Sequence, residues 1–391
     1  MTFDDRSLKN STIVIPLHLP LEYPCDYIDQ TARILSKNNS VILFDYFHPY
    51  SWKQVLSIAN LRNLLDSLLA MRRSKKTVYF RAPSVLPFAR FKKINALNAR
   101  FGYFILSLVL SIWNKKVIVW QFAPLIKSKF FKKQFFVYDC VDYVNSEDNR
   151  KGYLIEEEKL LRTSDLIAFN SARLFDNKKR ANPITEGKSV VTVCGCDYRL
   201  FSPRKAKIAP ELADINQRMV AFMGVFDHRL DAELLAHAVK NNKNKKFILI
   251  GPIRKSAPKS LNKIITAENV LYLGEKRKKE LPSYLKKCHL GIIPYDTKNR
   301  NVKYANPMKA YEYLACGLPV VSTGILALKD MPKDIVYTTD DRAEFSRAIE
   351  KIAADWHRGK TALAKKIAKK NSWENKILLI EKAISKYGKT N

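Results

Sequence analysis

The chain has 391 residues, of which 47% are hydrophobic and 11% aromatic, which is enough for a globular protein with two domains of nearly equal size. Basic residues outnumber acidic ones by 69 to 37, and the net charge of +32 implies a polyanionic neighbour, such as anionic lipid headgroups, nucleic acid or an acidic saccharide. The six scattered cysteines lack zinc-ligand spacing, which argues against a disulfide framework or a zinc finger and indicates reduced thiols.

Strand and helix patterns alternate along the first half of the chain. Strands are expected at 12–17, 40–45, 77–81, 117–121, 135–139, 166–170 and 189–193, and helices at 26–38, 53–71, 93–113 and 151–163. This alternation predicts a parallel, doubly wound sheet. His18 follows the first strand and Asp142 follows the fifth, so both are expected at the carboxyl edge of this sheet. Alternatively, His18 is a partly buried structural histidine and Asp142 caps the next segment.

The most apolar run of the chain is 101–113, bounded by Arg100 and by lysines at 115 and 116. Thirteen residues fall short of the ~20 needed to span a bilayer, so the run predicts a helix buried against a sheet and no membrane span. A helix that dips into lipid is the alternative. Basic clusters containing phenylalanine, at 90–93 and 127–133, suit a membrane interface, although coding bias alone can enrich a surface in lysine.

A second strand and helix series follows a polar, proline-punctuated break near 197–215. Strands are expected at 219–223, 247–250, 270–273, 290–294 and 319–322, with helices near 231–240, 280–287 and 306–316. The chain then turns helical through 342–355, 361–369 and 373–387. The series predicts a second parallel sheet.

The segment 306–323 carries the strongest chemical signal. Asn306 is a good helix cap, Pro307 suits the first helical position and Gly317 closes the helix before a β-branched strand. The amino end of such a helix attracts phosphate, and Lys309 adds a positive charge there. Glu312, one turn later, can accept hydrogen bonds from the vicinal hydroxyls of a sugar. The succession of a helix amino end, a cation and a carboxylate therefore suggests a binding site for a nucleotide diphosphate. The alternative is an ordinary solvated pair between Lys309 and Glu312.

The sequence Pro307-Met-Lys-Ala-Tyr-Glu-Tyr-Leu-Ala-Cys-Gly-Leu-Pro-Val-Val321 resembles the donor-binding segment of bacterial GT-B glycosyltransferases of the "group 1" (family 4) superfamily. The branch it resembles most includes the teichuronic-acid-type and xanthan glucuronosyltransferase-type enzymes. Other segments agree in order, and the likeness extends over residues 135–325; these segments are 137–142, 164–171, 195–201, 247–252, 280–285 and 290–295.

The resemblance implies an α/β protein of the GT-B fold, with two Rossmann-like, doubly wound parallel-sheet domains that face an interdomain cleft. Residues 1–205 would form the acceptor-binding domain and 206–372 the domain that binds the nucleotide-sugar donor. The last segment, 373–391, would be a helix that crosses back to the first domain. The glycine-rich loop usual near the start of the family is absent, because residues 13–20 contain no glycine.

The resemblance also implies a donor site on the second domain. In that family the carboxylate that matches Glu312 holds the nucleotide ribose, and the region of Met308 and Lys309 faces the diphosphate. We include the preceding Asn306 and Pro307 in this expected site.

Two further residues complete the expected donor site. Most family members carry a glutamate that contacts the donor sugar eight residues before the one matching Glu312, but this chain has Tyr304 there. Arg229 lies in the loop after the first strand of the second domain, where ligands of parallel sheets bind. It is expected to contact phosphate, or else to form a surface ion pair with Asp227 or Asp231.

To catalyse glycosyl transfer, a protein must bind the leaving diphosphate, exclude water, and deprotonate or orient the acceptor hydroxyl. GT-B enzymes use a helix dipole and basic side chains where other enzymes use a metal ion, and the sequence has no Asp-X-Asp cluster in a metal-ligand loop. We therefore expect no metal and no cofactor. Asp142 is the candidate general base for an inverting reaction, and His18 the alternative residue, able to donate to developing charge.

The implied function is transfer of a sugar from a nucleotide diphosphate-sugar, foremost a UDP-sugar, to a lipid-linked, polysaccharide or lipopolysaccharide acceptor. The acidic start of the chain is unlike a secretory signal, so we expect a cytoplasmic protein held peripherally at the anionic inner face of the membrane. A catalytically silent GT-B relative is the second hypothesis, supported by Tyr304. A nucleic-acid-binding protein is the third, favoured by charge alone and opposed by the lack of any recognisable nucleic-acid motif.

Overall fold

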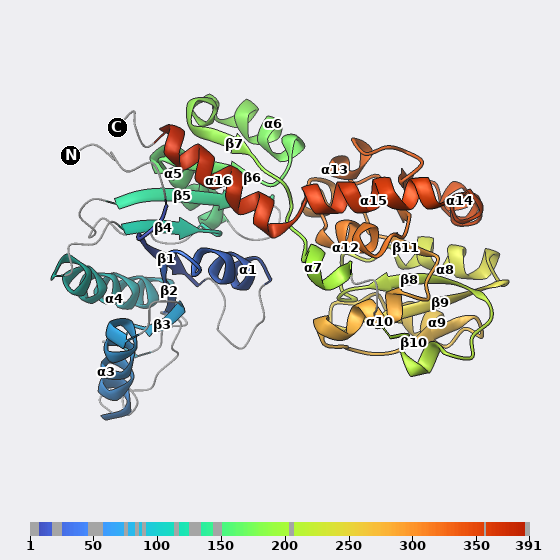
Figure 1. Ribbon diagram of the computed structural model, residues 1–391, viewed down its shortest axis with the longest axis horizontal. Helices are drawn as coiled ribbons and strands as arrows, with labels where there is room; N and C mark the ends of the chain where they lie inside the picture. The colour runs from blue at the N-terminus through green and yellow to red at the C-terminus, as the bar shows by residue number, and fades with distance from the viewer. Residues whose placement is uncertain are drawn as a thin grey trace. The chain divides into compact units, whose positions relative to one another are not determined.

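The computed structural model describes most of the chain, which folds into two compact units (Figure 1). The described ranges are 8–17, 26–45, 58–73, 77–82, 86–87, 91–112, 117–124, 134–143, 151–202, 207–355 and 357–387. The first unit takes its described residues from 1–170, 175–192 and 377–391, and the second from 171–174 and 193–376. Each unit is built around its own parallel sheet.

The sheet of the first unit has seven strands in the order β3-β2-β1-β4-β5-β6-β7, all parallel. Their bounds are β1 Thr12–Pro16, β2 Ser40–Asp45, β3 Thr77–Arg81, β4 Val117–Gln121, β5 Gln134–Cys140, β6 Leu166–Phe169 and β7 Ser189–Val191. Val14 of β1 is level with Ile42 of β2 and Val119 of β4. The strand order reverses beside β1, and β1 and β4 are buried along their whole length, as expected for central strands of a sheet covered on both faces.

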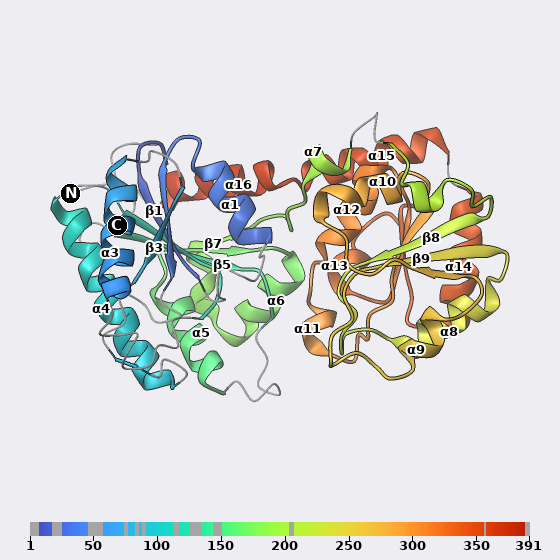
Figure 2. The same cartoon turned by 90° about the horizontal axis from the view of Figure 1, so that it is seen from below.

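Helices cover both faces of this sheet (Figures 1 and 2). On one face, α1 (Asp26–Leu35) and the terminal helix α16 (Trp373–Tyr387) pack onto alternate residues of β1, β2 and β4. On the other face, α3 (Ile58–Arg73) and α4 (Lys92–Ile112) pack onto the intervening residues of the same strands. The helices α5 (Lys151–Thr163) and α6 (Ala172–Ala181) follow β5 and β6.

The second unit has a six-stranded parallel sheet in the order β10-β9-β8-β11-β12-β13. Its strands are β8 Arg218–Met223, β9 Lys245–Ile250, β10 Val270–Tyr272, β11 Leu290–Ile293, β12 Val320–Ser322 and β13 Val336–Thr338. The main helices are α8 Ala232–Asn241, α9 Leu261–Ile265, α10 Leu281–Leu285, α11 Arg300–Lys303, α12 Met308–Cys316, α13 Leu326–Lys329, α14 Arg342–Ala354 and α15 Arg358–Lys370. The two sheets confirm the predicted α/β class with two doubly wound, parallel-sheet units.

The helix α4 corrects the expectation for the apolar run 101–113. The helix is 21 residues long, and in the described part of the chain Lys93–Ser111 is long and apolar enough to cross a membrane by length and composition. Only 39% of that window is buried, and helices in protein cores pass the same test. Tyr103, Leu106 and Leu110 face the sheet and belong to the core. The helix itself was predicted at 93–113, close to its observed bounds, but the span argument counted only the thirteen residues of the apolar run and left out the preceding part of the same helix.

Candidate functional site

Two glycines mark the carboxyl edge of the second sheet. Gly224 follows β8 and Gly251 follows β9, with φ angles of 144° and 141°. A Cβ atom on Gly251 would lie 1.9 Å from the carbonyl oxygen of Gly224, so the two backbones approach more closely than any side chain would allow. This packing holds the loop after β8, which carries Arg229, against the neighbouring strand.

The helix α12 begins one residue later than the sequence predicts. Pro307 is the N-cap residue and Met308 the first helical residue, so the prediction of Asn306 as the cap was wrong. The reason is that the Asn306 side chain accepts a hydrogen bond from the Tyr311 hydroxyl at 2.8 Å. Gly317 ends the helix in the left-handed conformation with φ 84°, as predicted.

Lys309 lies against an aromatic wall at the carboxyl edge of the sheet. Its ammonium nitrogen contacts the Tyr295 hydroxyl and lies 4.6 Å from the centroid of that ring and 5.2 Å from the centroid of the Phe222 ring. A Cβ atom on Gly224 would come within 2.3 Å of the same nitrogen. The Lys309 side chain therefore points at the loop after β8, as a phosphate-binding cation would need to do.

Arg229 converges on the same tyrosine. Its guanidinium carbon lies 5.7 Å from the Tyr295 ring centroid, and its Nη2 and Nε atoms donate to the Asp227 carboxylate at 2.7 and 2.9 Å. Burial alone would raise the pKa of Asp227, but the hydrogen bonds and charge of Arg229 outweigh it and the pKa is lowered. The ion pair with Asp227 was one of the two roles considered for Arg229. Because the Arg229 side chain is 41% exposed, it also remains accessible to a ligand.

Glu312 pairs with a lysine that the motif did not reveal. The carboxylate of Glu312 is buried, and its Oε1 atom lies 3.3 Å from the ammonium nitrogen of Lys278. Lys278 opens the short helix η3 (Lys278–Glu280), in the basic cluster 276–279. In the structure Lys309 therefore faces Tyr295 while Glu312 faces Lys278, and the two do not form the solvated i,i+3 pair considered as the alternative.

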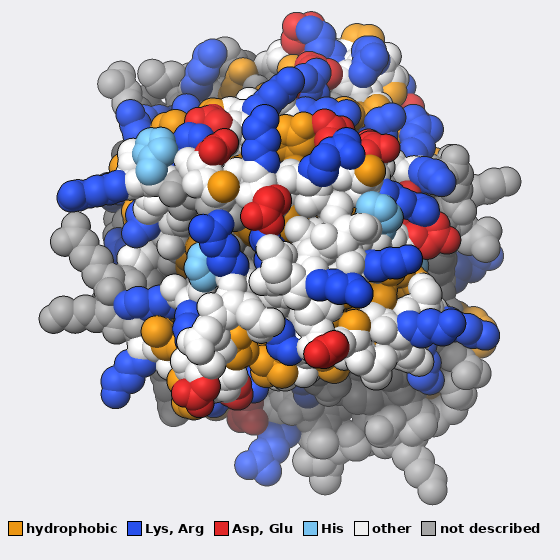
Figure 3. All heavy atoms as spheres, turned by 90° about the vertical axis from the view of Figure 1, so that its right-hand side faces the viewer, with side chains coloured by type: hydrophobic (Ala, Val, Ile, Leu, Met, Phe, Trp, Pro, Cys, Tyr) orange, Lys and Arg blue, Asp and Glu red, His pale blue; other side chains and the backbone are white. Residues whose placement is uncertain are grey.

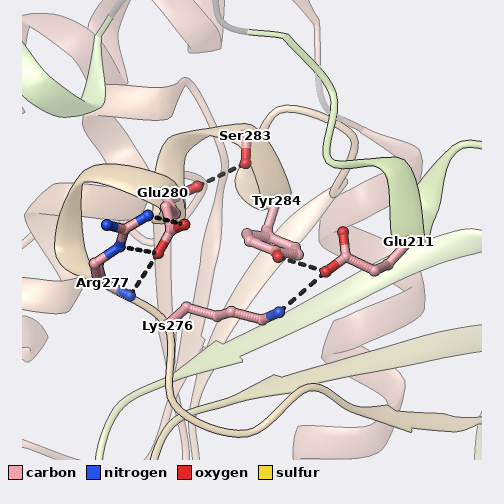
Figure 4. A network of polar contacts seen from close by, with 6 residues as sticks. All are labelled: Glu211, Lys276, Arg277, Glu280, Ser283 and Tyr284. Atoms are coloured by element: carbon pink, nitrogen blue, oxygen red, sulfur yellow. Dashed lines mark hydrogen bonds and ion pairs between the residues drawn. The ribbon is translucent and has the colours of Figure 1, made fainter.

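Polar contacts fix the segment that carries Lys278 (Figure 4). Lys276 donates to the Glu211 carboxylate at 3.0 Å, and Tyr284 donates to the same oxygen at 2.8 Å. The Arg277 guanidinium and backbone amide both donate to Glu280. The carboxyl of Glu211 accepts hydrogen bonds from its own backbone amide, from Tyr284 and from Lys276, in decreasing order of effect. These hydrogen bonds lower the pKa of Glu211 to about 2, so this network stays ionised at neutral pH.

The other predicted residues lie in different surroundings. Tyr304 is the C-cap residue of α11 and is half-buried, and Met308 packs against the core of the second unit. Asp142 belongs to the first unit, where it is exposed just after β5; the loop is tied by a 2.6 Å hydrogen bond from Asn170 to the Val141 carbonyl. His18 lies outside the described residues.

Potential metal ligands are dispersed. Among the described residues, no group of three or more His, Cys, Asp or Glu side chains lies close enough to hold a metal ion. The cysteines near the site serve as buried packing groups: the Cys194 thiol donates to the Asn306 carbonyl at 2.8 Å, and burial, then the charge of Glu312, raises the pKa of Cys196. Metal-independent chemistry stays a prediction.

Residues 217–355, which carry Arg229, Lys278, Lys309 and Glu312, match the family described as "Glycosyl transferases group 1". A curated protein of Bacillus subtilis (strain 168), named as the teichuronic acid biosynthesis glycosyltransferase TuaH, is 28% identical over 247 residues, or 59% of this chain. The chain spans 61%, about three fifths, of the length of that relative. The match lies in the branch that the sequence resemblance indicated.

Solved structures agree on the fold. Sucrose-phosphate synthase from Thermosynechococcus elongatus superposes with a TM-score of 0.69 at 15% identity, over 98% of this chain and 100% of that one. Anabaena Alr3699/HepE in complex with UDP gives a TM-score of 0.66 at 14% identity, over 96% and 100% of the two chains. The match to the glycosyl transferases group 1 family is confined to residues 217–355, whereas the two parallel sheets and the similar solved structures show that the chain has the GT-B fold.

Proposed function

We propose that the protein is a glycosyltransferase that uses a nucleoside diphosphate-sugar, foremost a UDP-sugar, as its donor. The observation that carries the proposal is the convergence of Lys309 and Arg229 on Tyr295, at the carboxyl edge of the second sheet and beside the start of α12. The family match covers this region, and the structurally similar HepE is described in complex with UDP, which supports the choice of donor.

The geometry assigns a part of the donor to each group. The first amides of an α-helix lack intrahelical partners and carry the positive end of its dipole, so those of α12 suit the diphosphate. Lys309 and Arg229 add the charge that stabilises a departing nucleoside diphosphate without a metal ion. The Glu312 carboxylate accepts hydrogen bonds from the ribose hydroxyls. Asn306 and Pro307 shape the loop that leads into the helix, and Tyr304 occupies the sugar-contacting position of the family.

An inverting reaction requires a base for the acceptor hydroxyl, and we assign that role to Asp142. Its carboxylate is exposed on the loop after β5, at the edge of the first sheet where ligands of parallel folds bind. The loop is anchored by Asn170, which limits its freedom and favours a fixed orientation of the base. His18, after β1, remains the second candidate.

The donor assignment is tested with a panel of UDP-, GDP- and TDP-sugars. We expect saturable binding of one nucleotide and slow hydrolysis or transfer of its sugar. Replacing Glu312 with glutamine should weaken binding about 10-fold, because a charged acceptor becomes a neutral one and such a hydrogen bond contributes about 1.5 kcal/mol or more. The matched control is Glu275→Gln, an exposed glutamate of the same unit, which should leave binding unchanged.

Two other outcomes would overturn the enzymatic proposal. Donor binding without turnover, even with lipid-linked acceptors, would indicate a catalytically silent relative. Steeply salt-dependent binding of duplex DNA or RNA, unaffected by Glu312→Gln, would indicate a nucleic-acid-binding protein. On the face seen in Figure 3, lysine and arginine side chains are spread out, with acidic side chains between them, and do not line one groove. This face therefore gives little support to the nucleic-acid-binding hypothesis.

We further propose that the first unit rests on the cytoplasmic, anionic face of a membrane, where the acceptor would be lipid-linked. The support is an apolar surface on the outer side of α3 and α4, which cover the same face of the first sheet. About half of each of its five large side chains is exposed: Leu65, Leu69, Leu97, Phe104 and Leu108. Exposed Lys93 and Arg100 on α4 supply cations beside it, and this combination suits insertion among anionic headgroups.

Vesicle flotation tests this surface. The protein should float with vesicles containing phosphatidylglycerol and much less with pure phosphatidylcholine. Phe104→Ser combined with Leu108→Ser should lower the bound fraction at least about 10-fold, because two partly buried apolar side chains contribute more than about 1.4 kcal/mol. Leu363→Ser with Leu378→Ser removes two similarly exposed leucines from other helices and serves as the control. Equal loss in both double variants, or equal binding to both lipids, would contradict the assignment.

A further inference from the structure

The Lys278 side chain buries its charged end, unlike a typical surface lysine. Lysines normally bury their aliphatic stems and keep the ammonium group in water. Here the ammonium nitrogen is shielded from solvent while 26% of the side chain remains exposed. Placing a charge inside a protein is costly unless an opposite charge faces it, and the Glu312 carboxylate, 9% exposed, lies 3.3 Å away. The Lys278 charge is therefore directed at the one carboxylate that the donor-binding motif contributes.

The backbone around Lys278 is held before any ligand arrives. Lys276 is tied to Glu211 and lies 5.3 Å from the centroid of the Tyr284 ring, and Arg277 is tied to Glu280 (Figure 4). Fixing a lysine side chain in one conformation costs conformational entropy. A rigid backbone lowers the further cost of aligning Lys278, which is how supporting residues preorganise a binding group.

We propose that Lys278 is a positioning residue for nucleotide binding, which orients the Glu312 carboxylate toward the ribose without touching the nucleotide itself. The proposal rests on the assignment of Glu312 to the ribose. A buried carboxylate with an adjacent cation is a fixed anion that can accept hydrogen bonds from two neighbouring hydroxyls. Without the cation, the same carboxylate would turn toward solvent or toward its own backbone, and the ribose would lose an aligned acceptor.

Isothermal titration with UDP and with 2′,3′-dideoxy-UDP tests the proposal. Lys278→Met should weaken UDP binding about 10-fold and leave the binding of the dideoxy analogue unchanged, because only UDP presents the ribose hydroxyls. Lys278→Arg should restore most of the affinity, since it keeps the charge. Lys279→Met, an exposed neighbour in the same basic cluster, is the control and should bind UDP as the wild type does. In a Glu312→Gln background, Lys278→Met should cause no further loss.

The outcomes separate this inference from the proposed function. Equal weakening of UDP and dideoxy-UDP by Lys278→Met would place Lys278 at the base or phosphate and overturn the positioning role. Unchanged UDP binding in Lys278→Met, with Glu312→Gln still impaired, would also overturn it while leaving the donor site intact. If the wild type binds no UDP, GDP or TDP, the donor site itself is refuted, and the inference with it. Should Lys278→Met unfold, Lys278→Gln, which also removes the charge, provides the same comparison, with Lys278→Arg as the variant that keeps the charge.

Discussion

Replacing Lys309 with methionine should weaken the binding of UDP about 100-fold with little change in stability. The Lys309 ammonium sits at the Tyr295 hydroxyl and beside two aromatic rings, where its charge faces the loop after β8. A hydrogen bond between a cation and a phosphate oxygen contributes up to about 3 kcal/mol, which corresponds to this factor. Methionine keeps most of the length and apolar contact of lysine, so it removes the charge and preserves the packing.

Comparison of UDP with uridine identifies the group that Lys309 contacts. Titration calorimetry should show the loss for UDP and no change for uridine, which lacks the diphosphate. Lys303→Met on the nearby helix α11 is the matched control, because Lys303 is exposed and the same net charge is removed. A similar loss for uridine, or a similar loss in the control, would show that Lys309 does not act on the diphosphate.

The fold was largely predictable because buried parallel strands have a strong local pattern. The first-unit strands predicted at 40–45, 77–81 and 117–121 have the bounds of β2, β3 and β4. The edge strand β13 (Val336–Thr338) was missed, since three residues between loops give no periodicity. The helix α4 was predicted at 93–113 and is observed at Lys92–Ile112, but its suitability as a membrane span was judged from the apolar run that starts at 101, because polar side chains interrupt the hydrophobic pattern before that residue.

The candidate site was predictable only where its residues share one segment. Lys309 and Glu312 lie in one helical turn, so the sequence places them together. Lys278 reaches Glu312 because α10, which follows it, packs near α12, and that packing is a tertiary property. The sequence shows four consecutive basic residues at 276–279 and contains no signal for which of them turns inward. Asn306 likewise failed as a cap because its side chain binds the Tyr311 hydroxyl.

Replacing Lys178 with methionine should destabilise the protein by about 3–5 kcal/mol, a large part of the total stability of a typical domain. Lys178 on α6 and Glu157 on α5 form a buried pair in the first unit, with 7% and 3% of their side chains exposed and 2.6 Å between Nζ and Oε2. Tyr138 donates to the other carboxylate oxygen at 3.2 Å. Loss of the lysine leaves an uncompensated charge in the core, which explains the size of the effect.

Urea unfolding of matched variants measures this cost. Lys179→Met removes the neighbouring lysine, whose partner Glu186 is exposed, and should change stability by less than about 1 kcal/mol. Glu157→Leu combined with Lys178→Met removes both charges and should recover most of the loss, because a neutral pair carries no desolvation penalty. Equal losses in the Lys178 and Lys179 variants would contradict the assignment of a buried, mutually dependent pair.

The dependence on pH gives an independent check of the same pair. Burial raises the pKa of Glu157, and the attraction of Lys178 only partly offsets it. A raised native pKa means that the native state binds the proton more tightly than the unfolded state, so this group favours folding at low pH and the benefit is lost as pH rises through that pKa. Without Lys178 the offset disappears and the pKa rises further. The destabilisation of Lys178→Met should therefore be smaller at about pH 5 than at about pH 8, whereas loss of packing alone would be the same at both.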